Sequence, residues 1–245
     1  MAQSVPDFYN NEAVFAKYMS HRQRVDTAND TLEKPVIMDL ILPVTGKRVL
    51  DLGCGDAAIG PELLQYGAAS YLGVEGSHKM AATAKQTLAE MPEKIILHNI
   101  EDWTYPHAAF DLVIARLSLH YIANLAPIFT NVFQALTPTG KFVFSVEHPV
   151  ITSSDKGWIS ETNRQDWLVD DYFTTGLRVT NWLGGTVQKY HRTVEDYFRL
   201  LQAAGFMIEG LREACPKREN FQDVKTYERR SRIPLFLILA ASKPL

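Results

Sequence analysis

The stretch Arg48-Val49-Leu50-Asp51-Leu52-Gly53-Cys54-Gly55-Asp56 joins an apolar run to an acid, two alternating glycines and a second acid. This order predicts a buried strand that stops at Asp51, a tight turn through the two glycines, and a helix that begins near Asp56. Glycine allows the backbone angles of such a turn and lets a ligand approach the main chain closely. Because open α/β sheets bind ligands at the carboxyl ends of their strands, the stretch predicts an α/β fold with a nucleotide-like ligand here.

Charge distinguishes between two ligands for this turn. The segment Gly53–Ala58 fits the G-x-G-x-x-G/A pattern of dinucleotide sites, where a pyrophosphate lies against a helix N-terminus. Asp51 and Asp56 would repel that pyrophosphate, since like charges about 4 Å apart cost roughly 4 kcal/mol at a near-surface dielectric. A ligand with an ammonium and a sulfonium group would be attracted instead. The two acids therefore favour S-adenosylmethionine, and a dinucleotide oxidoreductase remains as the last alternative.

Five segments resemble the motifs of the class I S-adenosylmethionine-dependent methyltransferases, in particular the bacterial small-molecule methyltransferases of the type 11/12 group. In chain order they are Val49–Gly55, Tyr71–Ser77, His98–Trp103, Phe110–Arg116 and Thr137–Ser145. The resemblance runs from about Val36 to the C-terminus. It implies an α/β fold: a Rossmann-like three-layer sandwich around a seven-stranded, mostly parallel sheet whose last strand is antiparallel.

The resemblance also implies which residues bind S-adenosyl-L-methionine, which becomes S-adenosyl-L-homocysteine. Glu75 ends the second strand, where an acid can accept both ribose hydroxyls. Either Glu101 or Asp102 would read the adenine edge, while Met80 is either an adenine contact or a core residue. Arg116 either pairs with a carboxylate or forms a structural ion pair. The residues expected at the cofactor are Asp51, Gly53, Cys54, Gly55, Glu75, Gly76, Ser77, Met80, Ile100, Glu101, Asp102 and Arg116.

The hydrophobic pattern predicts strands that alternate with helices, as in a mainly parallel sheet. The predicted strands are Arg48–Cys54, Ser70–Glu75, Ile95–Ile100, Phe110–Arg116, Gly140–Glu147, Met207–Ala214 and Leu235–Ser242. The predicted helices between them are Asp56–Tyr66, Ser77–Glu90, Leu125–Leu136 and Thr193–Ala204. Ser77 and Thr193 are the expected N-caps, and Gly67 and Gly205 the expected helix stops.

We expect a single methyltransferase domain over residues 1–245 with two additions to the core. It divides into an N-terminal helical arm (1–42), a cofactor-binding core (43–148), an inserted lid (149–192), and a C-terminal helix with the last two strands (193–245). The arm has helical patterns over Asn11–Arg24 and Thr31–Ile41. Within it Tyr18, Arg22 and Asn29 are expected to fold over the cofactor, as in similar arms of bacterial small-molecule methyltransferases.

The lid interrupts the alternation of strands and helices. Gly184-Gly185 between Leu177–Leu183 and Thr186–Arg192 predicts a β-hairpin with a two-residue turn. The segment is rich in aromatic residues, namely Trp158, Trp167, Tyr172, Phe173 and Trp182. We expect arm and lid together to enclose a small acceptor with a flat or apolar body, between the arm, Arg116–Tyr121, His148 and the Tyr172–His191 hairpin.

Histidine is the usual general base near neutral pH, and three of the seven histidines follow predicted strands at the carboxyl edge. They are His120, His148 and His191. For each of them a structural role is the alternative. We expect at least one of the three to face the acceptor and to remove a proton from a hydroxyl group. The spacing of histidines, cysteines and acids does not indicate a metal site.

The composition limits the other possibilities. A net charge of −3 gives no basic surface of the kind that nucleic-acid binding requires. Two cysteines are too few for a disulfide framework, and no apolar run is long enough to cross a bilayer. We therefore expect a cytoplasmic monomer or homodimer that acts on a small molecule. The alternatives are a methyltransferase for RNA or protein, and a non-catalytic protein that binds S-adenosylmethionine.

Overall fold

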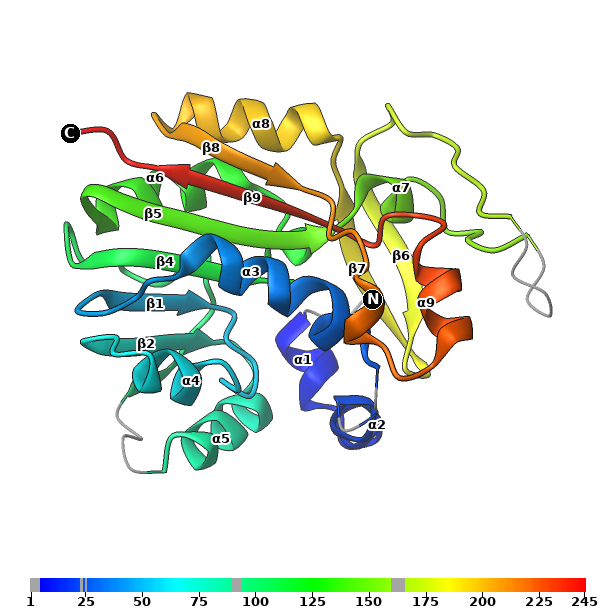
Figure 1. Cartoon of the computed structure of the whole chain (residues 1–245), viewed down its shortest axis with the longest axis horizontal. Helices are drawn as coiled ribbons and strands as arrows, with labels where there is room; N and C mark the ends of the chain where they lie inside the picture. Colours follow the sequence, from blue (N-terminus) through cyan, green and yellow to red (C-terminus); the bar gives the residue numbers. More distant parts are fainter. Residues whose placement is uncertain (1–4, 23, 25, 90–93, 160–165) are drawn as a thin grey trace.

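A seven-stranded sheet forms the centre of the computed structural model, which describes residues 5–22, 24, 26–89, 94–159 and 166–245. The strand order is β3-β2-β1-β4-β5-β9-β8 (Figure 1). The strands are β1 (Arg48–Leu52), β2 (Ser70–Glu75), β3 (Ile95–Leu97), β4 (Phe110–Arg116), β5 (Leu136–Glu147), β8 (Met207–Arg212) and β9 (Phe236–Ser242). β9 runs antiparallel to β5 and β8, whereas β1 to β5 pair in parallel. The predicted Rossmann-like sheet is confirmed.

Alternating side chains divide the core into two layers, one on each face of the sheet. In β1, Leu50 and Leu52 belong to one apolar cluster, and Val49 belongs to the other. The helices α6 (Leu125–Ala135) and α8 (Val194–Ala203) cover the first cluster. The helices α3 (Lys34–Ile41), α4 (Gly60–Gln65) and α5 (His78–Thr87) cover the second. The strands are apolar on both sides because both faces of the sheet are covered.

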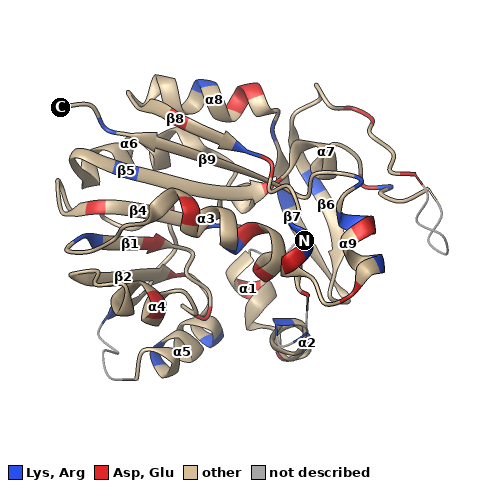
Figure 2. Ribbon diagram, in the orientation of Figure 1, with Lys and Arg blue, Asp and Glu red and all other residues tan. Residues whose placement is uncertain are grey.

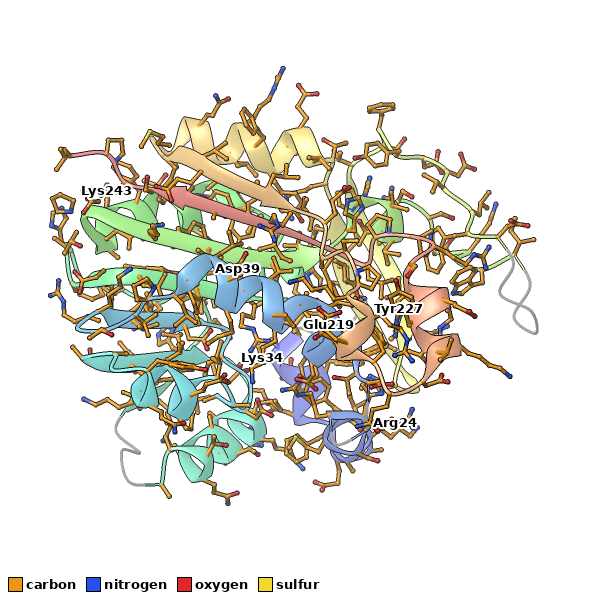
Figure 3. The ribbon with its side chains drawn as sticks, viewed as in Figure 1. Arg24, Lys34, Asp39, Glu219, Tyr227 and Lys243 are labelled. Carbon is orange, nitrogen blue, oxygen red and sulfur yellow. The ribbon has the colours of Figure 1, made fainter. Side chains whose placement is uncertain are left out.

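The remaining elements gather at the carboxyl edge of the parallel strands. They comprise α1 (Val5–Asn10), α2 (Glu12–Arg22), a π-helical turn η1 (Asn29–Glu33) that leads into α3, the 3₁₀ turns η3 (Leu119–Tyr121) and η4 (Arg218–Asn220), α7 (Pro149–Thr152), the hairpin β6 (Gly176–Trp182) and β7 (Gly185–His191), and α9 (Val224–Arg230). Tyr227 on α9 lies at this end of the molecule, and Lys243 after β9 lies at the other end (Figure 3).

The helix after the glycine turn begins later than the sequence predicts. Ala57 has a left-handed backbone with φ of 53°, and its carbonyl accepts from Gly60 N at 2.9 Å. The turn therefore continues to Ile59, and α4 starts at Gly60 rather than near Asp56. Asp56 lies in the turn before the helix and not at the helix start.

The hairpin is present, but its turn lies one residue earlier than predicted. Trp182 pairs with Gly185, so the turn residues are Leu183 and Gly184, with φ of 52° and 82°. Two-residue hairpin turns of type I′ require positive φ at both positions. Gly185 is small for another reason: a Cβ there would lie 2.9 Å from Phe8 Cε2 of the arm. Packing against α1, not turn geometry, requires the second glycine.

Several boundaries and short helices differ from the prediction. The helices α1, α7 and α9 were not predicted from the sequence. The side chain of Asp223 caps α9 by accepting from Lys225 N and Thr226 N. β3 ends at Leu97, so Ile100 lies beyond the strand, whereas β5 begins earlier, at Leu136. The predicted helix Ser77–Glu90 ends at Glu90, which lies outside the described residues, and the predicted helix Asn11–Arg24 includes Gln23, which also lies outside them.

The predicted caps are confirmed. Ser77 Oγ accepts from Met80 N at 3.2 Å, and Thr193 forms a reciprocal capping box with Asp196. Gly67 and Gly205 have φ of 89° and 94°, as residues that end helices commonly do. Among the residues that the structure describes, no helix has the length and apolar character needed to cross a membrane.

Replacing the N-cap of α8 should lower stability without affecting the site. In Thr193→Ala, Asp196 N loses its 3.1 Å bond to Thr193 Oγ1. We expect a loss of about 1 kcal/mol and a fall in melting temperature of about 2–4 °C, measured by differential scanning calorimetry. Thr130→Ala, which removes only the exposed bond to Ala126 O in α6, is the control and should change the melting temperature less.

Candidate functional site

Two adjoining cavities lie at the carboxyl edge of the sheet. The larger has a volume of about 810 Å³ and the smaller a volume of about 60 Å³. Both are lined by the glycine turn, the end of β4 and the arm. The shared lining residues are Tyr18, Arg22, Asn29, Gly53, Gly55, Arg116 and Leu117. The structure thus brings together the predicted first motif, the predicted fourth motif and all three arm residues.

Asp51 is a buried carboxylate at the wall of the smaller cavity. Asp51 is the second-to-last residue of β1, one position before Leu52. The residue is only 2% exposed and lines the cavity. Tyr71 Oη donates to Oδ2 at 2.7 Å, but Oδ1 is buried and has no hydrogen-bond partner among the residues described. Burial raises the pKa of Asp51 from 3.8 to about 7. A buried carboxylate oxygen without a partner favours a cationic ligand group in this cavity.

The turn itself leaves no room for larger side chains. Gly53 has φ of 71°, and a Cβ on it would lie 2.5 Å from Ser118 Cβ. Gly53 N and Cys54 N both donate to Val74 O, at 2.8 and 3.1 Å, which fixes the turn against β2. Cys54 lines the smaller cavity. The glycines therefore hold the main chain close to any ligand in both cavities.

Glu75 lies at the end of β2 and lines the larger cavity. Its two carboxylate oxygens accept from Gly55 N at 2.9 Å and from Ser77 N at 2.8 Å. Burial raises the pKa of Glu75, although these backbone donors oppose the shift. Each oxygen keeps a second lone pair, so the carboxylate can still accept from the hydroxyls of a ribose.

The residues predicted around the adenine line the same cavity, with one exception. The lining includes Gly76, Met80, Ile100, Glu101 and Asp102. Met80 is buried at the start of α5, so it is both a core residue and a cavity wall. Ser77 lines neither cavity: it is buried as the N-cap of α5, and its hydroxyl donates to Asn10 Oδ1 at 2.8 Å.

The arm supplies a cation to the wall. Arg22 on α2 lies 3.7 Å from Asp56 and 3.8 Å from Asp30, measured between the nearest charged atoms. These contacts are long for ion pairs, so the guanidinium can still bind an anion. Arg22 lines both cavities with Tyr18 and Asn29, and Asp51 of β1 lines the smaller one. One cation and one buried carboxylate at one cavity fit a ligand with an α-carboxylate and an α-ammonium group.

Arg116 forms a structural ion pair and also lines both cavities. Its Nε donates to both oxygens of Glu33 at 3.1 Å, and its Nη2 pairs with the same carboxylate. Glu33 is 0% exposed and accepts a third donor, Ser145 Oγ, at 2.7 Å. The sequence analysis did not identify Glu33, because its partners are distant along the chain. Arg116 thus forms the structural ion pair, and because it lines both cavities its contact with a ligand carboxylate stays a prediction.

Of the three candidate histidines, only His120 lines the larger cavity. It is buried, and burial lowers its pKa from 6.5 to about 4, so the ring is neutral near pH 7. Its Nδ1 accepts from Glu147 N at 3.4 Å. A neutral ring that accepts at Nδ1 carries its proton on Nε2, so it presents a donor and not a base to its surroundings.

His148 and His191 are buried in structural hydrogen bonds and line neither cavity. His148 caps α7 by accepting from Val150 N, and its Nε2 lies 3.1 Å from Glu213 Oε1. His191 bonds Thr152 Oγ1 at 2.8 Å and Tyr172 O at 2.9 Å, which uses both ring nitrogens. Their placement gives the general-base prediction no support at these two positions.

The rest of the larger cavity has aromatic walls, but few of them come from the predicted lid residues. Trp182 lines the cavity, whereas Trp158 and Trp167 pack on each other at 5.3 Å and Phe173 is 87% exposed. The remaining aromatic lining residues are Tyr9, Tyr18, Tyr121, Tyr190 and Phe236. Lys and Arg residues occur on β7 and α9 at this end of the molecule (Figure 2), and Arg230 lines the cavity.

Comparison with known proteins identifies the class of this site. A methyltransferase domain model matches residues 50–144. The crystal structure of an S-adenosylmethionine-dependent methyltransferase from Mesorhizobium loti aligns with a TM-score of 0.77 and 35% identity, over 86% of this chain and 97% of that one. A Listeria monocytogenes protein of the same class aligns with a TM-score of 0.79 and 34% identity, over 87% and 97%. The chain belongs to the S-adenosylmethionine-dependent methyltransferases.

The methyltransferase is therefore an enzyme whose methyl donor is S-adenosylmethionine. Its site fits that donor. The unpartnered Asp51 oxygen suits a cationic group, and the glycine turn lets the ligand approach the main chain closely. Glu75 can accept from the two hydroxyls of a ribose. The comparisons also include a trans-aconitate 2-methyltransferase from Acidovorax, 32% identical over 104 residues, which are 42% of this chain and 38% of that enzyme. Among the described residues, no group of three or more His, Cys, Asp or Glu could hold a metal ion.

Asp51 should make the stability of the ligand-free methyltransferase depend on pH. Because its folded-state pKa of about 7 lies above the ordinary 3.8, its contribution is fully present below pH about 4 and is lost as pH rises through about 7. We expect the stability of the wild type relative to Asp51→Asn to fall by about 2–4 kcal/mol between pH 4 and 7, measured by urea denaturation.

Asp39→Asn, which changes an exposed carboxylate on α3, is the control and should show a much smaller dependence. A difference between wild type and Asp51→Asn that stays constant over this pH range would contradict the argument. Bound S-adenosylmethionine should favour the ionised form of Asp51, so calorimetry in two buffers of different ionisation enthalpy should detect proton release on binding near pH 7.

Proposed function

We propose that the methyltransferase transfers the methyl group of S-adenosylmethionine to an oxygen or nitrogen atom of a small-molecule acceptor. The observation that carries this proposal is the larger cavity. A single space of about 810 Å³ is lined both by the adenosine-side motifs and by aromatic residues of the arm and the hairpin. Ligand sites commonly have volumes of about 300–1,000 Å³, so this space suits a donor and a small acceptor together.

The walls around the acceptor end come from segments outside the sheet. Tyr9 and Tyr18 belong to the arm, Trp182 and Tyr190 to the hairpin, and Arg230 to α9. Tyr9 Oη lies 3.5 Å from Tyr121 Oη, which links the arm to the segment after β4. An acceptor surrounded by so many segments has to be small. The relationship to a trans-aconitate 2-methyltransferase supports the same class of acceptor.

The chemistry requires little of the protein beyond orientation. The sulfonium of the donor is already activated, so transfer needs a nucleophile in line with the methyl–sulfur bond. Alignment of two reactants can supply roughly 7–11 kcal/mol of a barrier. In this proposal Asp51 and Arg22 hold the amino-acid end of the donor, Glu75 holds its ribose, and the aromatic walls fix the acceptor body.

We propose for His120 a different role from the one expected from the sequence. It is neutral, and its Nδ1 accepts from Glu147 N, so Nε2 carries the proton. In this proposal His120 donates a hydrogen bond in the acceptor region and does not remove a proton. We infer that His120→Ala lowers turnover through misplacement of the acceptor and leaves donor affinity unchanged.

Replacing Glu75 should test the donor site. We expect Glu75→Ala to weaken binding of S-adenosylhomocysteine about ten- to a hundredfold, because a charge-assisted hydrogen bond is worth about 1.5–3 kcal/mol. Isothermal titration gives the affinity, and Glu195→Ala on α8, an exposed acid paired with Arg199, is the control. Equal affinity in wild type and Glu75→Ala would show that the ribose is held elsewhere.

The activity itself is tested by release of S-adenosylhomocysteine in the presence of a panel of small metabolites. Turnover with at least one member supports the proposal. Donor binding without turnover on any member would instead support a binding protein that senses S-adenosylmethionine. Turnover only with RNA or protein would show a macromolecular acceptor.

A further inference from the structure

Glu147 places a carboxylate in the acceptor part of the larger cavity. It is the last residue of β5, and Arg116 at the end of β4 pairs with Ser145, two positions earlier. Glu147 therefore lies at the same edge of the sheet as the cofactor residues of β1, β2 and β4. Its side chain is 23% exposed and lines the cavity, as do His120 and Tyr121 of the segment after β4.

One oxygen of this carboxylate, Oε1, has a hydrogen-bond partner among the described residues. Lys189 Nζ of β7 donates to Oε1 at 2.6 Å, and the Lys189 side chain is 9% exposed. Oε2 has no hydrogen-bond partner among the residues that the structure describes. Because Glu147 lines the cavity, this oxygen is open to a ligand there. A fixed carboxylate with one open oxygen can accept a hydrogen bond from an N–H or O–H group of a ligand.

The surrounding aromatic rings favour a ligand with positive charge. Tyr9, Tyr121, Trp182 and Tyr190 all line this cavity. Lys189 Nζ already lies 5.9 Å from the centroid of the Trp182 ring, so this wall contacts one ammonium group in the protein itself. Aromatic faces attract cations, and an aromatic wall next to a carboxylate is a common arrangement for binding amines.

We propose that Glu147 binds the nucleophilic amine of the acceptor through Oε2, so that the methyltransferase methylates nitrogen in a small amine. This inference rests on the proposed transfer to a small molecule. The lone pair of the neutral amine attacks the methyl carbon, the carbon–sulfur bond breaks, and its electron pair goes to sulfur. The nitrogen gains the positive charge that sulfur loses, and its proton then leaves to water.

A carboxylate beside the nitrogen stabilises that developing charge. Glu147 must stay ionised to do so. Burial alone would raise its pKa, but the charge of Lys189 and the hydrogen bond from Lys189 lower it. Lys189 has a second effect: by offsetting part of the charge of Glu147, it weakens the hold of the carboxylate on the protonated, non-nucleophilic ammonium form of the amine.

A carboxylic acid acceptor is the main competing class. Arg230 and His21 also line the cavity. Burial lowers the pKa of His21, and so do the nearby charges of Arg24, Arg22 and Arg230. This cluster could attract an anion. Glu147 would repel the reacting carboxylate, however, so the two classes make opposite predictions for its removal.

The first experiment compares acceptor classes. Release of S-adenosylhomocysteine is measured with wild-type enzyme and panels of small amines, alcohols and carboxylic acids. We expect turnover with amines. Turnover only with alcohols or acids would overturn the role of Glu147 while leaving the proposed small-molecule transfer intact. Failure of all three panels would count against the proposed transfer itself.

The second experiment measures binding and needs no turnover. Phenethylamine, phenethyl alcohol and phenylacetate share one aromatic body and differ in the terminal group. Their affinities are measured by titration in the presence of S-adenosylhomocysteine. We expect the wild type to bind the amine most tightly, and Glu147→Gln to weaken amine binding about ten- to a hundredfold.

Glu209→Gln on β8 is the matched control, because Glu209 is likewise paired with a lysine, Lys141 at 3.1 Å, but does not line the cavity. It should leave amine binding unchanged. Tighter binding of phenylacetate, no binding of the amine at millimolar concentration, or an unchanged affinity in Glu147→Gln would each overturn the inference. A melting curve of each variant verifies that it is folded.

Lys189→Met tests the positioning role of the lysine through the pH dependence of turnover. The charged or titratable groups that influence Glu147 and its neighbours are Lys189, His120, Tyr121 and Arg192. Without Lys189 the full charge of Glu147 favours the bound ammonium, so turnover should need a pH about one unit higher. A uniform loss of turnover at every pH would show that Lys189 is only structural.

Discussion

The site depends on one buried ion pair that joins the arm to the sheet. Glu33 is the last residue of the π-helical turn η1, and it is fully buried against Arg116 of β4 and Ser145 of β5. Removing one partner of such a pair leaves an uncompensated buried charge, which commonly costs about 3–5 kcal/mol. The arm therefore cannot leave the sheet without a large loss in stability. The cavity walls formed by η1 and α2 are held in place by this contact.

Residues whose role depends on local chemistry could be predicted from the sequence. Asp51 and Glu75 could be predicted to line the site, because parallel strands bring acids near their ends to one edge of the sheet. Gly53 could be predicted because only glycine fits its turn. Glu33 could not be found in this way, since it lies 83 positions from Arg116. The same rule applies to Glu147, which is the last residue of β5. The residue predicted there was its neighbour His148, because histidine is the usual general base.

Side-chain direction explains the other differences. Successive residues of a strand point to opposite sides, so Glu147 reaches the cavity while His148 turns away to cap α7. In the hairpin, the dipeptide Gly184-Gly185 indicates a turn but does not say which glycine forms it, and contact with Phe8 decides. Aromatic content likewise predicted an enclosed pocket, and Tyr18 of the arm was expected there, but nothing in the sequence indicated Tyr9.

The sheet and the added segments contribute different parts of the function. The sheet edge fixes the acids and glycines that suit the methyl donor, and such an edge recurs in enzymes with many acceptors. The proposed acceptor end is lined by residues of α1, β6, β7 and α9, which are not part of the central sheet. Glu147 is the point where the two meet, because it ends a sheet strand yet pairs with Lys189 of the hairpin. If Glu147 binds the acceptor as proposed, a change in the hairpin acts on the acceptor through this pair and leaves the donor residues of β1 and β2 in place.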